Sequence, residues 1–380
     1  MRELDLYLTA GGKRLRCGYT TGTCAAAAAR AAADLLLARL TVPSVVVSTP
    51  AGVDVTVDVE TSEQGLGWAR CSVRKDAGDD PDVTDGVLVF ARVSFAANGG
   101  IAIEGGEGVG RVTKPGLDQP VGAAAINSVP RAMIAQTLQE SAMAYGYTGG
   151  LQVEISIPQG LELAQRTFNP RLGIEGGISV LGTSGIVRPM SEEALVASLK
   201  LELRVLREAG AEHLLVVPGN YGRDFAQQTL GLSMDGGVQC SNYLGAVMDE
   251  AGLLGFRTLL VVGHIGKMAK VAAGVMNTHS RVADARLETL AAHAALSGAA
   301  KDVVTRIMDG ATTDAALDVL AEEGLLKPTM SSLTQALARR LAYRAAGKLQ
   351  AEALVFSNVH GILGKTSGAD SLAMFHRGGG

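Results

Sequence analysis

The chain has 380 residues, which exceeds the roughly 250 to 300 residues that usually share one hydrophobic core, so we expect two domains. Apolar residues make up 47% of it and charged residues 19%, a composition typical of folded enzymes and not of disordered chains. The formal net charge of −4 argues against a general nucleic-acid-binding protein, so a polyanionic ligand would need a local cluster of Arg and Lys.

The cysteines and the N-terminus bear on the cellular compartment. The four cysteines form no Cys-x-x-Cys pair, which argues against a zinc knuckle or a redox dithiol and favours reduced thiols. No stretch reaches the ~18 apolar residues of a membrane span, and Arg2, Glu3 and Asp5 lie where a secretory signal would need apolar residues. We therefore expect a cytoplasmic protein without a membrane partner. No spacing of His, Cys, Asp and Glu predicts a metal site.

The first half of the chain predicts an α+β domain. Hydroxyl and glycine residues at 20–23 precede an alanine-rich helix over 25–37, with Thr23 as the expected cap. Valines then alternate with polar residues on both sides of Pro50, which predicts a β-hairpin over 45–59. Further strands are expected at 68–74, 87–95 and 151–157, and a helix at 130–144. The glycine-rich segment 98–110 is expected to be a long functional loop or a linker.

The second half predicts an α/β domain. Helices are expected at 191–210, after 224, at 241–253 and from 267, in alternation with strands at 214–217 and 258–262. This alternation is typical of βαβ units in a mainly parallel sheet. More helix is expected at 284–296 and 300–347, and a last strand at 354–357. We therefore predict an α+β domain over residues 1–170, joined to an α/β domain with a mainly parallel sheet and βα glycine turns over residues 171–380.

Three apolar runs lead directly into Gly-x-x-Gly turns, which lie at Gly182–Gly185, Gly219–Gly222 and Gly263–Gly266. Short Val- and Leu-rich runs suit buried parallel strands, and glycines just beyond them let backbone amides approach a ligand. One such turn is more often a plain connection, but three at consecutive strand ends indicate a small-molecule site. None matches Gly-x-Gly-x-x-Gly, which argues against a dinucleotide dehydrogenase. Gly364-Lys-Thr resembles the end of a phosphate-binding P-loop, but Val359 stands where that loop would need its first glycine. This argues against a P-loop.

Several side chains at these turns and elsewhere could carry chemistry. His264 could act as an acid or base near neutral pH, or could hydrogen-bond to the loop backbone. His213 and His376 are interpreted as surface residues. The hydroxyls of Thr20, Thr21 and Thr23 suit anion binding and helix capping equally well. The cations available for ligand carboxylates, each of which could instead be a solvated charge, are Arg111, Lys114, Arg188, Arg223, Lys267 and Lys270.

Longer motifs occur in one order along the chain. They include Gly18-Tyr-Thr-Thr-Gly-Thr-Cys-Ala-Ala-Ala-Ala, the segment Gly-Gly-Glu-Gly-Val-Gly-Arg-Val-Thr-Lys-Pro-Gly-Leu that ends at Leu117, and Leu181-Gly-Thr-Ser-Gly-Ile-Val. Val217-Pro-Gly-Asn-Tyr-Gly, Ser241-Asn-Tyr-Leu-Gly and Gly263-His-Ile-Gly-Lys-Met-Ala-Lys extend the series. Together they closely resemble the CbiD family from about Leu15 to Gly364.

The resemblance implies the activity of that family, the cobalt-precorrin-5B C(1)-methyltransferases. These enzymes move a methyl group from S-adenosylmethionine to ring carbon C1 of a cobalt-containing tetrapyrrole, giving cobalt-precorrin-6A in anaerobic cobalamin biosynthesis. Cobalt would enter only as part of the substrate. The chemistry agrees with the residues, because methyl transfer needs alignment more than a covalent nucleophile.

The resemblance, taken with the turns, implies where the ligands bind. The second domain would bind the methyl donor, and the first would face the tetrapyrrole. The residues expected at the donor are Gly182, Thr183, Ser184, Gly185, Gly219, Asn220, Tyr221, Gly222, Gly263, His264 and Gly266. Those expected at the tetrapyrrole are Thr20, Thr21, Thr23, Arg111, Lys114 and Lys267. His264 is the candidate general base, although the reaction could dispense with one.

Two other functions stay open at this point. One is a nucleotide-dependent transferase, in which the glycine turns would cradle phosphates. The other is a non-catalytic tetrapyrrole-binding pathway protein, in which the turns would be structural only. The oligomeric state, a homo-oligomer included, and the order of substrate binding are open as well.

Overall fold

The computed structural model describes residues 2–10 and 12–377, and the chain divides into two compact units with the boundary between Glu192 and Glu193. We predicted this boundary at residue 170, which is too early. The segment that follows residue 170 belongs to the first unit because its short strands pair there: β12 (Ile174–Glu175) with β10 (Arg111–Val112), and β14 (Ile186–Val187) with β3 (Gly18–Tyr19). Pairing between residues so distant in sequence leaves no local signal.

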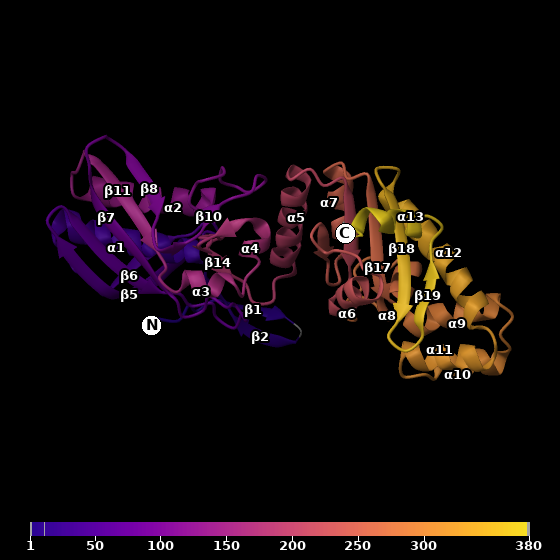
Figure 1. Ribbon diagram of the computed structural model, residues 1–380. Helices are drawn as coiled ribbons and strands as arrows, with labels where there is room; N and C mark the ends of the chain where they lie inside the picture. The colour runs from indigo at the N-terminus through magenta and orange to yellow at the C-terminus, as the bar shows by residue number, and fades with distance from the viewer. Residues whose placement is uncertain (1, 11, 378–380) are drawn as a thin grey trace. The chain divides into compact units, whose positions relative to one another are not determined.

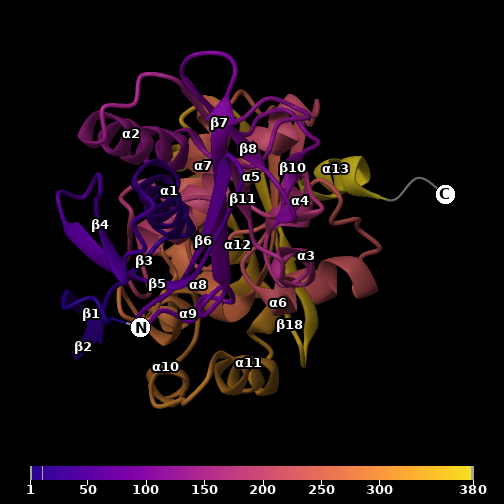
Figure 2. The same ribbon diagram turned by 90° about the vertical axis from the view of Figure 1, so that its left-hand side faces the viewer.

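The first unit is built on a six-stranded sheet with helices on one face. The strands, in spatial order, are β4 (Ser44–Ser48), β5 (Asp54–Gly65), β6 (Trp68–Arg74), β7 (Leu88–Ala96), β11 (Gly150–Ser156) and β8 (Ile101–Gly105). Neighbours are antiparallel except for β11 and β8. The helices α1 (Thr21–Ala38) and α2 (Ser128–Ala144) pack against each other, and both contact the sheet (Figures 1 and 2).

The core of the first unit follows from its sequence pattern. The alternating valines of the predicted hairpin point inward from β4 and β5, where Val47, Val55 and Val57 are each 1% exposed. The alanines of α1 between Ala25 and Ala33 are almost completely buried between the sheet and α2. Small side chains let these layers approach closely, so an 18-residue helix is buried along most of its length with large apolar groups only near its end, at Leu35 to Leu37.

The glycine-rich segment 98–110 was expected to lack regular structure, and this expectation is wrong. It contains β8 and the short strand β9 (Gly108–Val109), which pairs with β13 (Gly177–Ile178). Gly108 has a φ of 72°, and a Cβ there would lie 1.8 Å from the carbonyl oxygen of Ile157. The glycines therefore permit close backbone packing instead of flexibility. The other short elements of this unit are β1 (Tyr7–Ala10), β2 (Lys13–Arg16), α3 (Gly160–Ala164) and α4 (Asn169–Leu172).

The second unit contains the predicted parallel sheet. Its strands, in spatial order, are β16 (Gly237–Gln239), β15 (His213–Val217), β17 (Thr258–His264), β18 (Gln350–Ser357) and β19 (Gly361–Lys365). The first four are parallel to their neighbours, and β19 is antiparallel to β18. The outer strands β16 and β19 were not predicted, because a three-residue strand and a Gly-containing edge strand carry little apolar pattern.

Helices cover both faces of this sheet. Leu214 and Val216 of β15 belong to the apolar core on one face, and Leu215 and Val217 to the core on the other. The first core includes side chains from α5 (Glu192–Glu208), α7 (Leu244–Leu253), α8 (Ile265–Ala272), α9 (Arg286–Leu296), α10 (Lys301–Met308), α11 (Thr313–Glu322) and α12 (Leu326–Ala345). The second is smaller and lies under α6 (Asn220–Asp224), a π-helix (Phe225–Thr229), α13 (Ala369–Ala373) and a 3-10 turn (Met374–His376). None of the described helices combines the length and hydropathy needed to span a membrane.

Candidate functional site

Two of the three predicted glycine turns lie at the carboxyl edge of the parallel sheet in the second unit. The Gly219 turn follows β15, and the Gly263 turn spans the end of β17 and the start of α8. A Cβ at Gly222 would lie 2.7 Å from the carbonyl oxygen of Val262, so this glycine brings the two turns together. Gly219 has a φ of 108°, and among the described residues other than its two chain neighbours, a Cβ there would have only Lys267 Nζ, at 3.5 Å, within 4 Å. The backbone at Gly219 is therefore open, as a ligand-facing glycine should be.

The third turn, Gly182–Gly185, lies in the first unit, so our expectation that all three turns end strands of one sheet is wrong. It connects two-residue strands, β13 and β14. A Cβ at Gly182, where φ is 135°, would lie 2.3 Å from Thr20 Oγ1. Ser184 Oγ donates to the carbonyl of Ile186 at 3.0 Å, whereas Thr183 is exposed. Within the first unit, the turn is packed against the start of α1.

The three threonines predicted to bind the tetrapyrrole hold this packing together. Thr20, Thr21 and Thr23 are only 6%, 4% and 0% exposed. Thr20, not Thr23, is the N-cap of α1, and its Oγ1 accepts from the amide of Thr23 at 3.2 Å. Thr23 Oγ1 donates to the carbonyl of Gly185 at 2.7 Å, and Thr21 Oγ1 accepts from the amide of Leu181 at 3.0 Å. Contact between these hydroxyls and a ligand would require this packing to open.

The other predicted tetrapyrrole contacts of the first unit are exposed. Arg111 Nη1 lies 3.1 Å from Glu104 Oε1, and its Nη2 donates to the carbonyl of Gly105 at 3.3 Å. Lys114 donates to the carbonyl of Arg171 at 3.5 Å and has no carboxylate within 4.0 Å among the described residues. Both cations follow the close-packed glycine segment, which positions β10 and the loop after it. They remain accessible to a ligand carboxylate.

His264 is the last residue of β17 and the N-cap of α8. Its Nδ1 accepts from the amide of Gly266 at 3.2 Å. The edge of its ring meets the ring of Phe356, with centroids 5.5 Å apart, and the exposed ring of Tyr221 lies 6.1 Å away. Burial lowers the pKa of His264, and the nearby Asp314 carboxylate opposes this effect. The neutral form is therefore favoured at neutral pH.

The cap determines what His264 can do chemically. An Nδ1 that accepts a hydrogen bond carries no proton, so the proton of the neutral ring lies on Nε2. Nε2–H is a hydrogen-bond donor and has no lone pair free to accept a proton. Protonation at Nδ1 would break the cap of α8 instead. The geometry thus favours a donor at this position over the general base that we predicted.

Lys267 lies with the glycine turns of the second unit, although the sequence placed it at the tetrapyrrole. Its Nζ donates to the carbonyl of Ser241 at 2.9 Å, directly beyond the end of β16. Burial lowers the pKa of Lys267; the neighbouring Cys240 opposes this effect and Lys270 adds to it. Burial also raises the pKa of the Cys240 thiol to about 12, so this neighbour is uncharged.

The contribution of β16 to this edge was not predicted from the sequence. Gln239 Nε2 donates to Asn220 Oδ1 at 2.8 Å and so holds the Gly219 turn. Ser241 has a φ of 52°, a conformation that is uncommon outside glycine and is often found at functional sites. The motif that begins at Ser241 is the sequence feature that marks this segment. Its position at the carboxyl edge of the sheet follows only from the pairing of β16 with β15.

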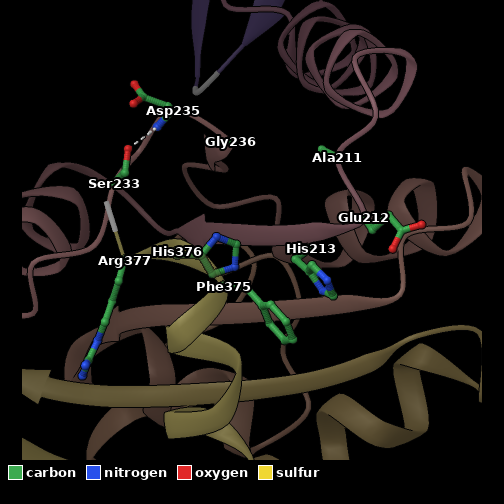
Figure 3. A pocket seen from close by; sticks show the side chains of 9 residues that line it. All are labelled: Ala211, Glu212, His213, Ser233, Asp235, Gly236, Phe375, His376 and Arg377. Carbon is green, nitrogen blue, oxygen red and sulfur yellow. Dashed lines mark hydrogen bonds between the residues drawn. The ribbon is translucent and has the colours of Figure 1, made fainter. Parts of the chain in front are cut away.

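A separate pocket of about 290 Å³ opens at the opposite, amino edge of the same sheet (Figure 3). The ring of His213 stacks on Phe375 there, with centroids 3.7 Å apart. His376 was predicted to be a surface residue, but it is only 7% exposed, and its Nε2 has no hydrogen-bond partner among the described residues. Burial lowers the pKa of His376 to about 4. No group of three or more His, Cys, Asp or Glu side chains within the described ranges converges to hold a metal ion.

Comparisons with known proteins concern nearly the whole chain. The CbiD family model matches residues 8–189, and the model of the CbiD C-terminal domain matches residues 277–367. A protein of Ruminiclostridium cellulolyticum is 49% identical over 94% of this chain and 93% of its own length. One of Alkaliphilus metalliredigens is 42% identical over 97% of both chains. Each relative bears the name cobalt-precorrin-5B C(1)-methyltransferase.

A solved structure is also similar to this chain. It is the crystal structure of the cobalamin biosynthesis protein CbiD from Archaeoglobus fulgidus, which is 32% identical. The match covers 74% of this chain and 88% of the other, with a TM-score of 0.41.

Proposed function

Because this chain belongs to the CbiD family, we propose that it is a cobalt-precorrin-5B C(1)-methyltransferase. It takes a methyl group from S-adenosylmethionine and gives cobalt-precorrin-6A in anaerobic cobalamin biosynthesis. The observation that carries this proposal is identity of 49% over 94% of the chain with a relative of that name. Four free cysteines, all buried, agree with a cytoplasmic location.

The reaction requires little covalent chemistry from the protein. The bond between the methyl carbon and sulfur breaks, and its electron pair stays on sulfur, giving S-adenosylhomocysteine. The ring carbon of the tetrapyrrole supplies the electron pair of the new carbon–carbon bond. Holding the two centres in line accounts for much of the acceleration in such reactions. The residues needed are therefore those that bind and orient, and a covalent nucleophile is not required.

The donor is proposed to lie at the carboxyl edge of the second unit's sheet. Ligands of parallel sheets bind beyond the carboxyl ends of the strands. The open backbone at Gly219 and the Nε2–H of His264 both belong to this edge. Tyr221, which is 67% exposed, could cover a bound nucleoside. The Gly182–Gly185 turn is left out of this site because it belongs to the first unit.

The tetrapyrrole is proposed to contact the first unit through Arg111 and Lys114. Both side chains are exposed, and both suit the carboxylates of the macrocycle. Cobalt takes part only as a component of this substrate. The buried threonines at the start of α1 support the fold of this unit and are not needed for the proposal.

Transfer of a labelled methyl group tests the function directly. The purified chain is mixed with methyl-labelled S-adenosylmethionine and cobalt-precorrin-5B, and label in the macrocycle is measured. We expect stoichiometric labelling with formation of S-adenosylhomocysteine. Binding of the macrocycle without labelling would identify a carrier. Tight binding of ATP or NAD, without binding of S-adenosylhomocysteine, would identify a nucleotide-dependent transferase.

A further inference from the structure

The ammonium group of Lys267 has no counter-ion among the described residues. Lys267 is half-buried, and its Nζ donates a hydrogen bond to the carbonyl of Ser241. Lys270 Nζ has Asp284 Oδ1 at 3.9 Å, but within the part of the chain that the structure describes no carboxylate lies within 4.0 Å of Lys267 Nζ. The charged neighbour is Lys270, a second cation, and Cys240 is a neutral thiol. A half-buried charge without a partner is costly, so an anion would be bound favourably here.

The surroundings place this charge at the sheet edge and leave it accessible. Lys270, by contrast, is 4% exposed, and its Nζ donates to the carbonyl of Thr278 at 3.2 Å. Lys267 Nζ would lie 3.5 Å from a Cβ on Gly219, so the ammonium lies over the open backbone of that turn. Ser241, which has the unusual φ, accepts at its carbonyl from the same nitrogen. Two of the three ammonium protons remain available to a ligand.

We propose that Lys267 binds the α-carboxylate of the methyl donor at the Gly219 turn. This inference rests on the proposed function, and it moves Lys267 from the tetrapyrrole to the donor. A carboxylate is the group that pairs with an ammonium, and the donor carries one at the end of its amino-acid chain. The tetrapyrrole also carries carboxylates. The position of Lys267 Nζ beside Gly219 favours the donor as the source.

The test compares two nucleosides that differ in the amino-acid group. S-adenosylhomocysteine carries the α-carboxylate, and 5′-methylthioadenosine lacks it. Lys267→Met removes the charge and keeps most of the aliphatic chain. We expect it to weaken binding of S-adenosylhomocysteine about ten- to a hundredfold, as loss of a charged hydrogen bond does, and to leave 5′-methylthioadenosine unaffected. Calorimetric titration of the full chain provides both affinities.

Two variants serve as controls. Lys267→Arg keeps the charge and should retain most of the affinity, while Lys301→Met removes an exposed positive charge of α10 and should change neither affinity. Equal weakening of both nucleosides by Lys267→Met would show a general structural effect and overturn the assignment, as would no weakening. If Lys267→Met weakens only the binding of cobalt-precorrin-5B, then Lys267 pairs with a carboxylate of the tetrapyrrole, and the assignment to the donor is wrong. If the unaltered chain does not bind S-adenosylhomocysteine, the proposed function itself fails.

Discussion

At the end of β17, His264 Nδ1 accepts a hydrogen bond from the amide of Gly266. The side chain therefore has two roles, a helix cap through Nδ1 and a hydrogen-bond donor through Nε2. His264→Asn should keep the cap, because an Asn oxygen is a good N-cap acceptor, and should remove the Nε2–H donor. We expect unfolding like that of the original protein and a loss of about 10- to 100-fold in kcat/KM, as expected for one hydrogen bond in the transition state.

The complementary variant distinguishes a donor from a base. His264→Gln places an amide N–H near the position of Nε2 and loses the cap, so α8 should be destabilised by about 1 kcal/mol while much of the methyl transfer remains. Thermal unfolding and steady-state kinetics measure the two effects. Equal and near-complete inactivation in both variants would support a general base instead.

Gly108 lies so close to the backbone at Ile157 that a side chain at this position should destabilise the first unit. Gly108→Ala places a Cβ 1.8 Å from the carbonyl oxygen of Ile157, whereas Gly122→Ala has a similar positive φ, 88°, and open space. We expect a cost of about 1 kcal/mol for Gly122→Ala and at least about 3 kcal/mol for Gly108→Ala. Urea unfolding of the two variants tests this, and similar costs would contradict the packing account.

Among the elements, the start of α1 and the Gly182–Gly185 turn form one packed structure. Thr23→Val should remove the hydrogen bond to the carbonyl of Gly185 and cost about 1 kcal/mol or somewhat more. Thr183→Val, at an exposed position, should cost less than about 0.5 kcal/mol. Neither variant should change the affinity for S-adenosylhomocysteine. If Thr183→Val weakens binding of S-adenosylhomocysteine, the Gly182–Gly185 turn contributes to the donor site after all.

His376, in the C-terminal 3-10 turn, makes the free energy of unfolding depend on pH. Burial lowers its pKa from about 6.5 to about 4, an effect that the neighbouring His213 reinforces. As the pH falls, the unfolded chain therefore binds the proton first. The contribution to stability is complete above about pH 6.5 and is lost progressively towards pH 4, by at most about 3 kcal/mol.

A variant isolates this contribution. His376→Leu removes the buried Nε2, which has no hydrogen-bond partner among the described residues. It should therefore reduce the difference in unfolding free energy between pH 7 and pH 5, with little loss of stability at pH 7. Urea unfolding at the two pH values measures this difference. An unchanged difference would mean that His376 does not titrate in this range.

At the scale of the whole molecule, the two units have separate cores. We expect a fragment of residues 191–380 to fold alone, because its sheet is covered by helices on both faces. It should unfold cooperatively and bind S-adenosylhomocysteine within about tenfold of the full chain, since the proposed donor residues all lie in it. Circular dichroism and calorimetry check the two expectations. A folded fragment without affinity would show that the first unit contributes to the donor site.

Local patterns in the sequence were sufficient for most elements and for the family. The valine alternation of β4 and β5 and the alanine run of α1 predict their structures because burial follows the period of the backbone. The ordered glycine motifs carry the resemblance to CbiD, which the near full-length identity confirms. The βαβ alternation also predicts the parallel strands β15 and β17, since buried apolar runs and helix patterns are local properties.

Contacts between distant residues gave the molecule its remaining features, for which no local pattern exists. Pairing of β14 with β3 brings Gly182 to Thr20 and makes its turn part of the first unit. Pairing of β16 with β15 brings Ser241 to Lys267 and moves that lysine to the donor turn. The cap on α8 sets the proton of His264 on Nε2. Each outcome depends on three-dimensional proximity and on which hydrogen-bonding groups are already occupied, and composition and periodicity do not encode either.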